Sequence, residues 1–130
     1  MLDFAVPINT KELELIKIPL NELALELRLE KGYQASGKAA RSLIRGDGLT
    51  VVLVALKQGA GLSEHHAPGH SVVTVLEGSI LFSGPNGADQ HQLLAHDCVV
   101  FPAGLPHAVE CTQDTLMQIV IGCRLQDNFK

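Results

Sequence analysis

The chain has 130 residues, of which 46% are hydrophobic, and this is enough to form the core of one domain. Its formal net charge is −4 and its ten Lys and Arg residues are scattered, which argues against nucleic-acid binding because phosphate contacts need clustered positive charge. Aromatic residues make up only 4% and Trp is absent, so a surface that stacks on bases or sugars is not indicated.

The N-terminal segment lacks the basic start and continuous apolar core of a secretory signal. No stretch reaches the ~20 apolar residues that a membrane helix needs, so a membrane partner is not expected. The three cysteines, Cys98, Cys111 and Cys123, form no C-x-x-C pair and are odd in number. Reduced thiols are the simplest interpretation, and these features together predict a cytoplasmic protein.

The first 36 residues predict an N-terminal extension with one short helix. Apolar residues follow helical spacing from Leu20 to Leu27, and Gly32 is a typical helix stop. We therefore expect an amphipathic helix over about 21–31.

From Ser42 onward the sequence changes to short strand-like runs separated by turn residues. The turns are expected at 46–48, 58–61, 77–78, 84–87, 103–104 and 113–114. Many short strands with Gly and Pro turns favour an all-β sandwich or barrel. The predicted organisation is a barrel over 37–125 with a C-terminal tail over 126–130.

Two histidine-bearing turns, each followed by a strand-like run, could converge in such a fold. His65, His66 and His70 surround a Pro68-Gly69 break, and His107 follows a Pro-x-Gly turn. Imidazoles gathered beside β segments indicate a metal-binding or proton-handling site.

Two segments resemble the paired motifs of the cupin superfamily, whose members are small jelly-roll barrels. The run 75–78, VLEG, resembles the end of the first motif, and 102–107, PAGLPH, resembles the centre of the second. The similarity extends from about Gly37 to Gly122. It implies a double-stranded β-helix (jelly-roll) barrel with a short N-terminal helix. It also implies a homodimer, with the 21–31 helix packed on the barrel or across the interface.

The register of the first motif differs with the glycine from which it is counted. Counting back from Gly78 places the motif's Glu at Ser71 and its first histidine at Glu64. Counting forward from Gly59 places that first histidine at His65. The difference of one residue predicts a β-bulge or loop adjustment between these glycines.

In the register counted from Gly78, alternation places Glu64 and His66 on one inward face, opposite His107. These three form the predicted minimal ligand set, with His65 or His70 as an added ligand; alternation by itself makes His65 a solvent-facing neighbour. Two imidazoles and a carboxylate can leave open positions on a divalent metal ion. Fe, Mn, Ni and Zn all remain candidates.

Two functions remain open from the sequence. The first is a small metal-binding cupin of undetermined substrate, with a divalent ion held at the barrel mouth. The alternative is a non-catalytic small-ligand-binding or sensor module without metal, which Ser71 at the motif's Glu position favours. Apolar residues expected inside, Val73, Val75, Val100 and Val109, favour a small and partly apolar ligand. Enzymatic activity is left open because a fold does not fix a function.

Overall fold

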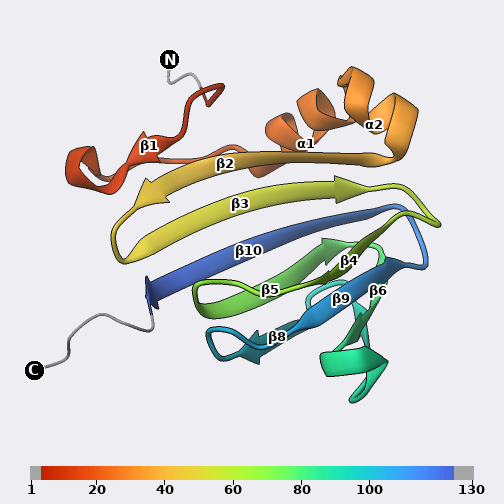
Figure 1. The fold of residues 1–130 in the computed structure, drawn as a ribbon. Helices are drawn as coiled ribbons and strands as arrows, with labels where there is room; N and C mark the ends of the chain where they lie inside the picture. The colour runs from red at the N-terminus through yellow and green to blue at the C-terminus, as the bar shows by residue number, and fades with distance from the viewer. Residues whose placement is uncertain (1–3, 125–130) are drawn as a thin grey trace, which may run out of the picture.

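The computed structural model describes residues 4–124, which form two β-sheets with the helices of residues 20–36 on one side (Figure 1). In chain order the elements are β1 (Ile8–Asn9), η1 (Thr10–Glu12), α1 (Leu20–Leu29), α2 (Lys31–Ser36), β2 (Lys38–Gly46), β3 (Leu49–Leu56), β4 (Gly61–His65), β5 (Gly69–Glu77), β6 (Ser79–Ser83), η2 (Pro85–Gly87), β7 (His91–Leu94), β8 (Cys98–Phe101), β9 (His107–Cys111) and β10 (Thr115–Arg124).

The larger sheet has six strands in the order β1-β2-β3-β10-β5-β8, and the smaller has four in the order β4-β9-β6-β7. The β1–β2 pair is parallel, and every other pair in the described part is antiparallel. Strand β10 lies between β3 and β5, so the end of the chain completes a sheet begun near its start. The prediction of a mostly β domain is confirmed. No ladder joins the two sheets within residues 4–124, so the described strands do not close into a barrel.

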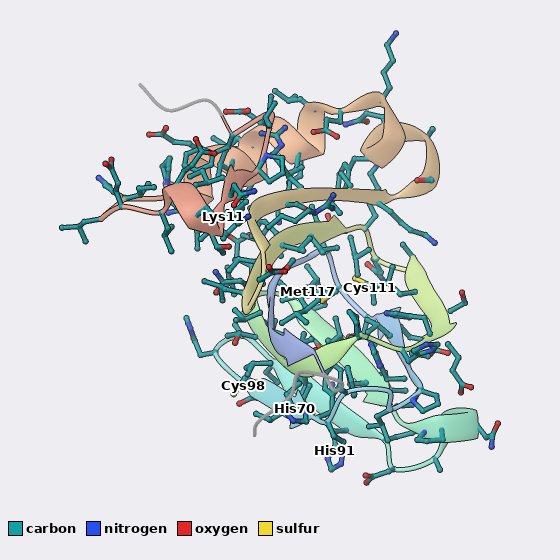
Figure 2. The ribbon with its side chains drawn as sticks, turned by 60° about the vertical axis from the view of Figure 1, so that its left-hand side comes forward. Lys11, His70, His91, Cys98, Cys111 and Met117 are labelled. Atoms are coloured by element: carbon teal, nitrogen blue, oxygen red, sulfur yellow. The ribbon has the colours of Figure 1, made fainter. Side chains whose placement is uncertain are left out.

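The core consists of two apolar layers on opposite faces of the larger sheet. Alternation along β5 places Val73 and Val75 between the sheets and Thr74 on the outer face. The inner layer also contains Met117 and Cys111, whereas His70 and Cys98 lie on the exterior (Figure 2). The outer layer packs α1 against strands β2 and β3.

Besides the 3-10 helix η1, the N-terminal extension contains two α-helices where the sequence predicted one helix over 21–31. Glu30 has an extended backbone, with φ −68° and ψ 146°, and this residue separates α1 from α2. Gly32 was expected to end the helix but lies inside α2. That helix is held by the buried ring of Tyr33 and ends at Gly37, where φ is +79°. A left-handed glycine is a common way to terminate a helix, and Gly37 N–H donates to Tyr33 O at 2.9 Å.

The described helices are too short or too polar for any of them to cross a membrane. Strand β2 begins at Lys38, four residues before Ser42, where the strand-like runs were expected to begin. The predicted tail over 126–130 lies outside the described residues.

Candidate functional site

His107 is the most enclosed histidine that the structure describes, with 5% of its surface exposed. The turn over 102–106 delivers it to the first position of β9. Its ring stacks on Phe82 at a centroid distance of 5.4 Å and an interplanar angle of 10°, and it lies 4.5 Å from the ring of Phe101. These contacts hold the imidazole between the two sheets.

His65 reaches His107 because β4 carries a bulge. Leu62 pairs with Val109, and the next registered pair is His65 with His107. Three steps along β4 therefore match two steps along β9, so β4 holds one extra residue. The bulge confirms the adjustment expected from the motif registers. It brings the rings of His65 and His107 to a centroid distance of 4.3 Å.

Both rings are oriented by a backbone carbonyl two residues earlier in the chain. Nδ1 of His65 lies 2.7 Å from Ser63 O, and Nδ1 of His107 lies 2.9 Å from Leu105 O. A carbonyl oxygen only accepts hydrogen bonds, so Nδ1 must carry the proton in each ring. In the neutral rings, Nε2 then has a free lone pair. Metal-bound histidines are commonly oriented by the same kind of contact.

A cavity of about 180 Å³ lies beside these rings. His66 also lines it, because the strand ends at His65 and strict alternation stops there. His65 and His66 are exposed and mark the solvent side, whereas the deeper wall is apolar. That wall and its rim are formed by Leu62, Ala67, Pro68, Ser71, Val73, Phe82, Phe101, Val109, Met117, Ile119 and Ile121.

The environment of His107 favours its neutral form. Burial lowers the pKa of His107 below the ordinary value of 6.5, and the nearby His65 and His66 lower it further when charged. The hydrogen bond to Leu105 O opposes this shift but does not reverse it. A neutral imidazole is the form that binds a metal.

Glu64 and His70, two of the predicted ligands, are engaged elsewhere. Glu64 Oε1 accepts a hydrogen bond from Asn86 N–H at 2.8 Å, and the residue is exposed. His70 Nδ1 accepts from Ala103 N–H at 3.1 Å, on the face of β5 opposite Ser71. Neither side chain lines the cavity. The expectation that Glu64 points inward and His65 outward was wrong, because the extra residue in β4 reverses the alternation.

Ser71 lines the cavity at the position where the motif count expects Glu. It is 1% exposed, and its hydroxyl donates to Gly69 O at 2.9 Å. The predicted interior placement holds for Val73, Val75 and Val109 but is wrong for Val100, which is 69% exposed. Sequence reasoning did not single out Phe82 or Phe101. Their spacing of two residues from Ile80 and Val99, apolar residues on the same strands, was the available signal.

The donor chemistry fits a metal that prefers imidazole, but not the predicted set with Glu64. Fe, Ni, Cu and Zn all accept neutral imidazole nitrogen. The described residues contain no group of three or more His, Cys, Asp or Glu side chains positioned to hold a metal ion. His65 and His107 form a pair at the cavity, and His66 lines the same cavity.

Residues 52–122 match the family model described as Cupin domain. Because this match spans more than half of the chain, the protein belongs to the cupin domain family. No curated protein matches the chain.

Solved structures share the fold at low identity. The conserved protein SPY1581 of unknown function from Streptococcus pyogenes is 24% identical with a TM-score of 0.69, over 91% of this chain and 95% of that chain. KdgF from Halomonas sp. is 20% identical with a TM-score of 0.61, over 70% and 83%. Salicylate 1,2-dioxygenase from Pseudoaminobacter salicylatoxidans is 20% identical with a TM-score of 0.66, over 78% of this chain but only 31% of that longer chain.

Proposed function

We propose that this cupin domain binds a divalent metal ion at the entrance of its small cavity, next to a small-molecule ligand. The observation that carries the proposal is the His65–His107 pair. The two ring centroids lie 4.3 Å apart, each ring has its Nδ1 on a backbone carbonyl, and neither Nε2 has a hydrogen-bond partner among residues 4–124. Such pre-orientation reduces the cost of fixing the rings around an ion.

His66 supplies the third donor in this proposal. It lines the same cavity, is exposed, and makes no side-chain hydrogen bond within the described part of the chain, so its ring can rotate toward the pair. Glu64 and His70 stay outside this set because each has its own backbone partner. A bound ion would supply Lewis acidity at the cavity entrance, or redox chemistry if it is iron. The protein's own residues hold the imidazoles in place and keep the cavity wall apolar.

Metal content tests this proposal directly. The purified protein is incubated separately with Fe(II), Mn(II), Ni(II) and Zn(II), desalted, and analysed by elemental mass spectrometry. The name of the dioxygenase with a similar fold makes Fe(II) the first ion to load. His65→Ala and His107→Gln are compared with His70→Ala and His91→Ala as matched controls, because His91 is exposed and paired with Asp89.

Near-stoichiometric metal in the parent, lost in the His65 and His107 variants and kept in both controls, is the expected result. Two outcomes contradict the proposal: no metal retained by the parent in any loading, or the same retention in all four variants. If only the His70→Ala variant failed to retain metal, the metal site would lie on the other face of β5.

The second candidate function is a ligand-binding or sensor module without metal. It is favoured by the lack of a three-donor group in the described residues and by the predominantly apolar cavity wall. The metal-loading experiment separates the two candidates. A parent that stays metal-free and still binds small molecules in the cavity supports the second.

We also propose that the two sheets belong to a jelly-roll and that the protein forms a homodimer in the cytoplasm. The family match and the sheet order support the first point. The dimer is supported by a partly exposed apolar hollow on the β2–β3 face, formed by Ala40, Val52, Val54, Leu62 and Ile119 among others. The free thiols of Cys98 and Cys111 support a reducing compartment. Light scattering after size exclusion tests the dimer.

A further inference from the structure

The cavity beside the histidines is smaller than most ligand sites. Its volume of about 180 Å³ equals that of about six liquid waters at ~30 Å³ each. Pockets for drug-sized ligands typically measure about 300–1,000 Å³. A ligand of this site is therefore either very small or continues outside the cavity.

A second hollow of about 540 Å³ adjoins the cavity at Pro68 and Ile121, which line both. Whereas the first cavity is mainly apolar, this polar groove lies at the β2–β3 hairpin. Its other lining residues are Arg45, Gly46, Asp47, Gly48, Thr50 and Gly122. A ligand that extends past Pro68 and Ile121 would leave apolar surroundings and enter the polar groove.

Arg45 is the cationic side chain of the groove, and the strand register places it near the cavity. It pairs with Thr50, and Thr50 pairs with Ile121 on the next strand. Its Nη2 donates to Ser42 Oγ at 3.1 Å, which holds the guanidinium along β2. No salt bridge involves Arg45 within the described part of the chain. Most of its five N–H donors therefore remain available for an acceptor.

Asp47 is the opposing charge of the groove. It occupies the hairpin turn between Gly46 and Gly48, and it is exposed. A carboxylate there is free to turn into solvent, whereas the Arg45 guanidinium is anchored through Ser42. The anchored charge is the better recognition element, because less side-chain freedom is lost on binding.

We propose that the ligand is a small organic acid, with its apolar body in the cavity and its carboxylate in the groove at Arg45. This inference rests on the proposed function in taking that cavity as the ligand site. Guanidinium groups match carboxylates through paired hydrogen bonds. The apolar wall around Val73, Phe82 and Met117 matches a compact hydrocarbon or aromatic body.

A homologous series of probes tests the proposal on the full-length protein: benzoate, phenylacetate, 3-phenylpropanoate and 4-phenylbutanoate, each with its neutral amide. Cavity occupancy is read from the ¹³C-methyl NMR signal of Met117, which lines the cavity and is one of two methionines in the chain. A Met117→Leu sample assigns the signal. Arg45→Gln is compared with the matched variant Asp47→Asn.

We expect one chain length to bind best and to shift the Met117 signal, with the acid tighter than its amide. Arg45→Gln should weaken that acid about fivefold, the size expected of an exposed ion pair, and leave its amide unchanged. Asp47→Asn should leave the acid unchanged or tighter. Equal affinity of acid and amide in the parent overturns the proposal, as does a failure of every acid to bind. The parent protein could instead prefer the phenylalkylamine of the same chain length, and Asp47→Asn could lose that preference. The groove would then recognise a cation through Asp47, and the proposal would be wrong.

Metal content is measured on the same preparations, so the two proposals can fail separately. A parent without metal whose acid binding still depends on Arg45 contradicts the metal site and supports the acid site. A parent that holds metal through His65 and His107 but shows no acid preference contradicts the acid site alone.

Discussion

His65 and His107 form a registered pair across β4 and β9, with one ring buried and the other exposed. Their centroids lie 4.3 Å apart with the planes tilted by 59°. A proton on either ring would place a positive charge against its neighbour, and His107 is the ring less able to be hydrated. The arrangement therefore lowers the pKa of His107 and favours its neutral form.

The lowered pKa of His107 predicts that the metal-free protein loses stability as the pH falls below about 6.5. Between this ordinary value and the lower folded-state pKa, the unfolded chain binds more protons than the folded one. The free energy of unfolding must then rise with pH across this window, by at most about 1.4 kcal/mol per pH unit. Below the folded-state pKa this contribution no longer changes.

Urea unfolding between pH 5 and pH 8 in the presence of a chelator measures this slope. His107→Phe should reduce the slope, and His91→Gln, which alters an exposed histidine, should leave it unchanged. A parent and a His107→Phe variant with the same slope would contradict the assignment. NMR titration of the His107 ring gives the folded-state value independently.

Gly78→Ala is expected to destabilise the protein by about 3 kcal/mol or more. Gly78 has φ +91°, which is unfavourable for an L residue, and an added Cβ would collide with Asp114 O and lie 2.8 Å from Thr115 Cα. Gly48→Ala is the matched control. Its φ is +85° with no atom within 4 Å of the added Cβ, so about 1 kcal/mol is expected. Equal losses in the free energy of unfolding for the two variants, measured by urea unfolding, would show that the structure relaxes around the Cβ added at Gly78.

Thr115→Val should cost about 1–3 kcal/mol although it changes little in shape. Thr115 is fully buried, and its hydroxyl accepts from Ser79 N–H at 3.1 Å and donates to Gln113 O at 2.9 Å. Valine would leave the Ser79 N–H without a partner. Thr112→Val removes an exposed hydroxyl that bonds Ser79 Oγ at 2.8 Å, and about 0.5 kcal/mol is expected there. Thermal unfolding of both variants measures their losses of stability, and the loss should be larger for Thr115→Val than for Thr112→Val.

Ser71→Glu is expected to make folding depend on metal. A carboxylate at this 1% exposed position would be buried in the cavity, which costs several kcal/mol without a counter-ion. An ion shared with His65 and His107 would offset that cost. We therefore expect a melting temperature well below the parent's in chelator, with a larger rise on adding Zn(II) than the parent shows. Ser71→Gln is the uncharged control, and an equal metal response from both variants would argue against shared ligation.

Much of the β organisation follows from local sequence signals. Alternation and turn glycines indicate strands β5, β6 and β10, and the positive φ of Gly78 and Gly104 agrees with the turns expected at these residues. The helix prediction was less accurate because Gly32 has a low helix propensity that packing of Tyr33 outweighs. Tertiary contacts, not spacing, decide where that segment ends.

The ligand set was harder to predict because one extra residue in a strand reverses the face on which every later residue of that strand lies. His107 was correctly expected to face the cavity, since its strand begins directly after a rigid turn. For β4, a regular count pairs Glu64 with His107, whereas the bulge pairs His65 with it. The motif registers indicated that an adjustment exists, but its position depends on the pairing with β9. That pairing is a long-range contact that the local sequence does not contain.

The bulge in β4 also gives the protein a simple way to change its chemistry. Removing His65 would leave β4 without the extra residue, restore the regular count and pair Glu64 with His107, which turns a carboxylate, in place of an imidazole, toward that ring. An entrance of neutral nitrogen donors would become one of mixed charge, suited to harder cations. A deletion of one codon, with no new amino acid introduced, would then be enough to change the set of donor groups at the cavity entrance.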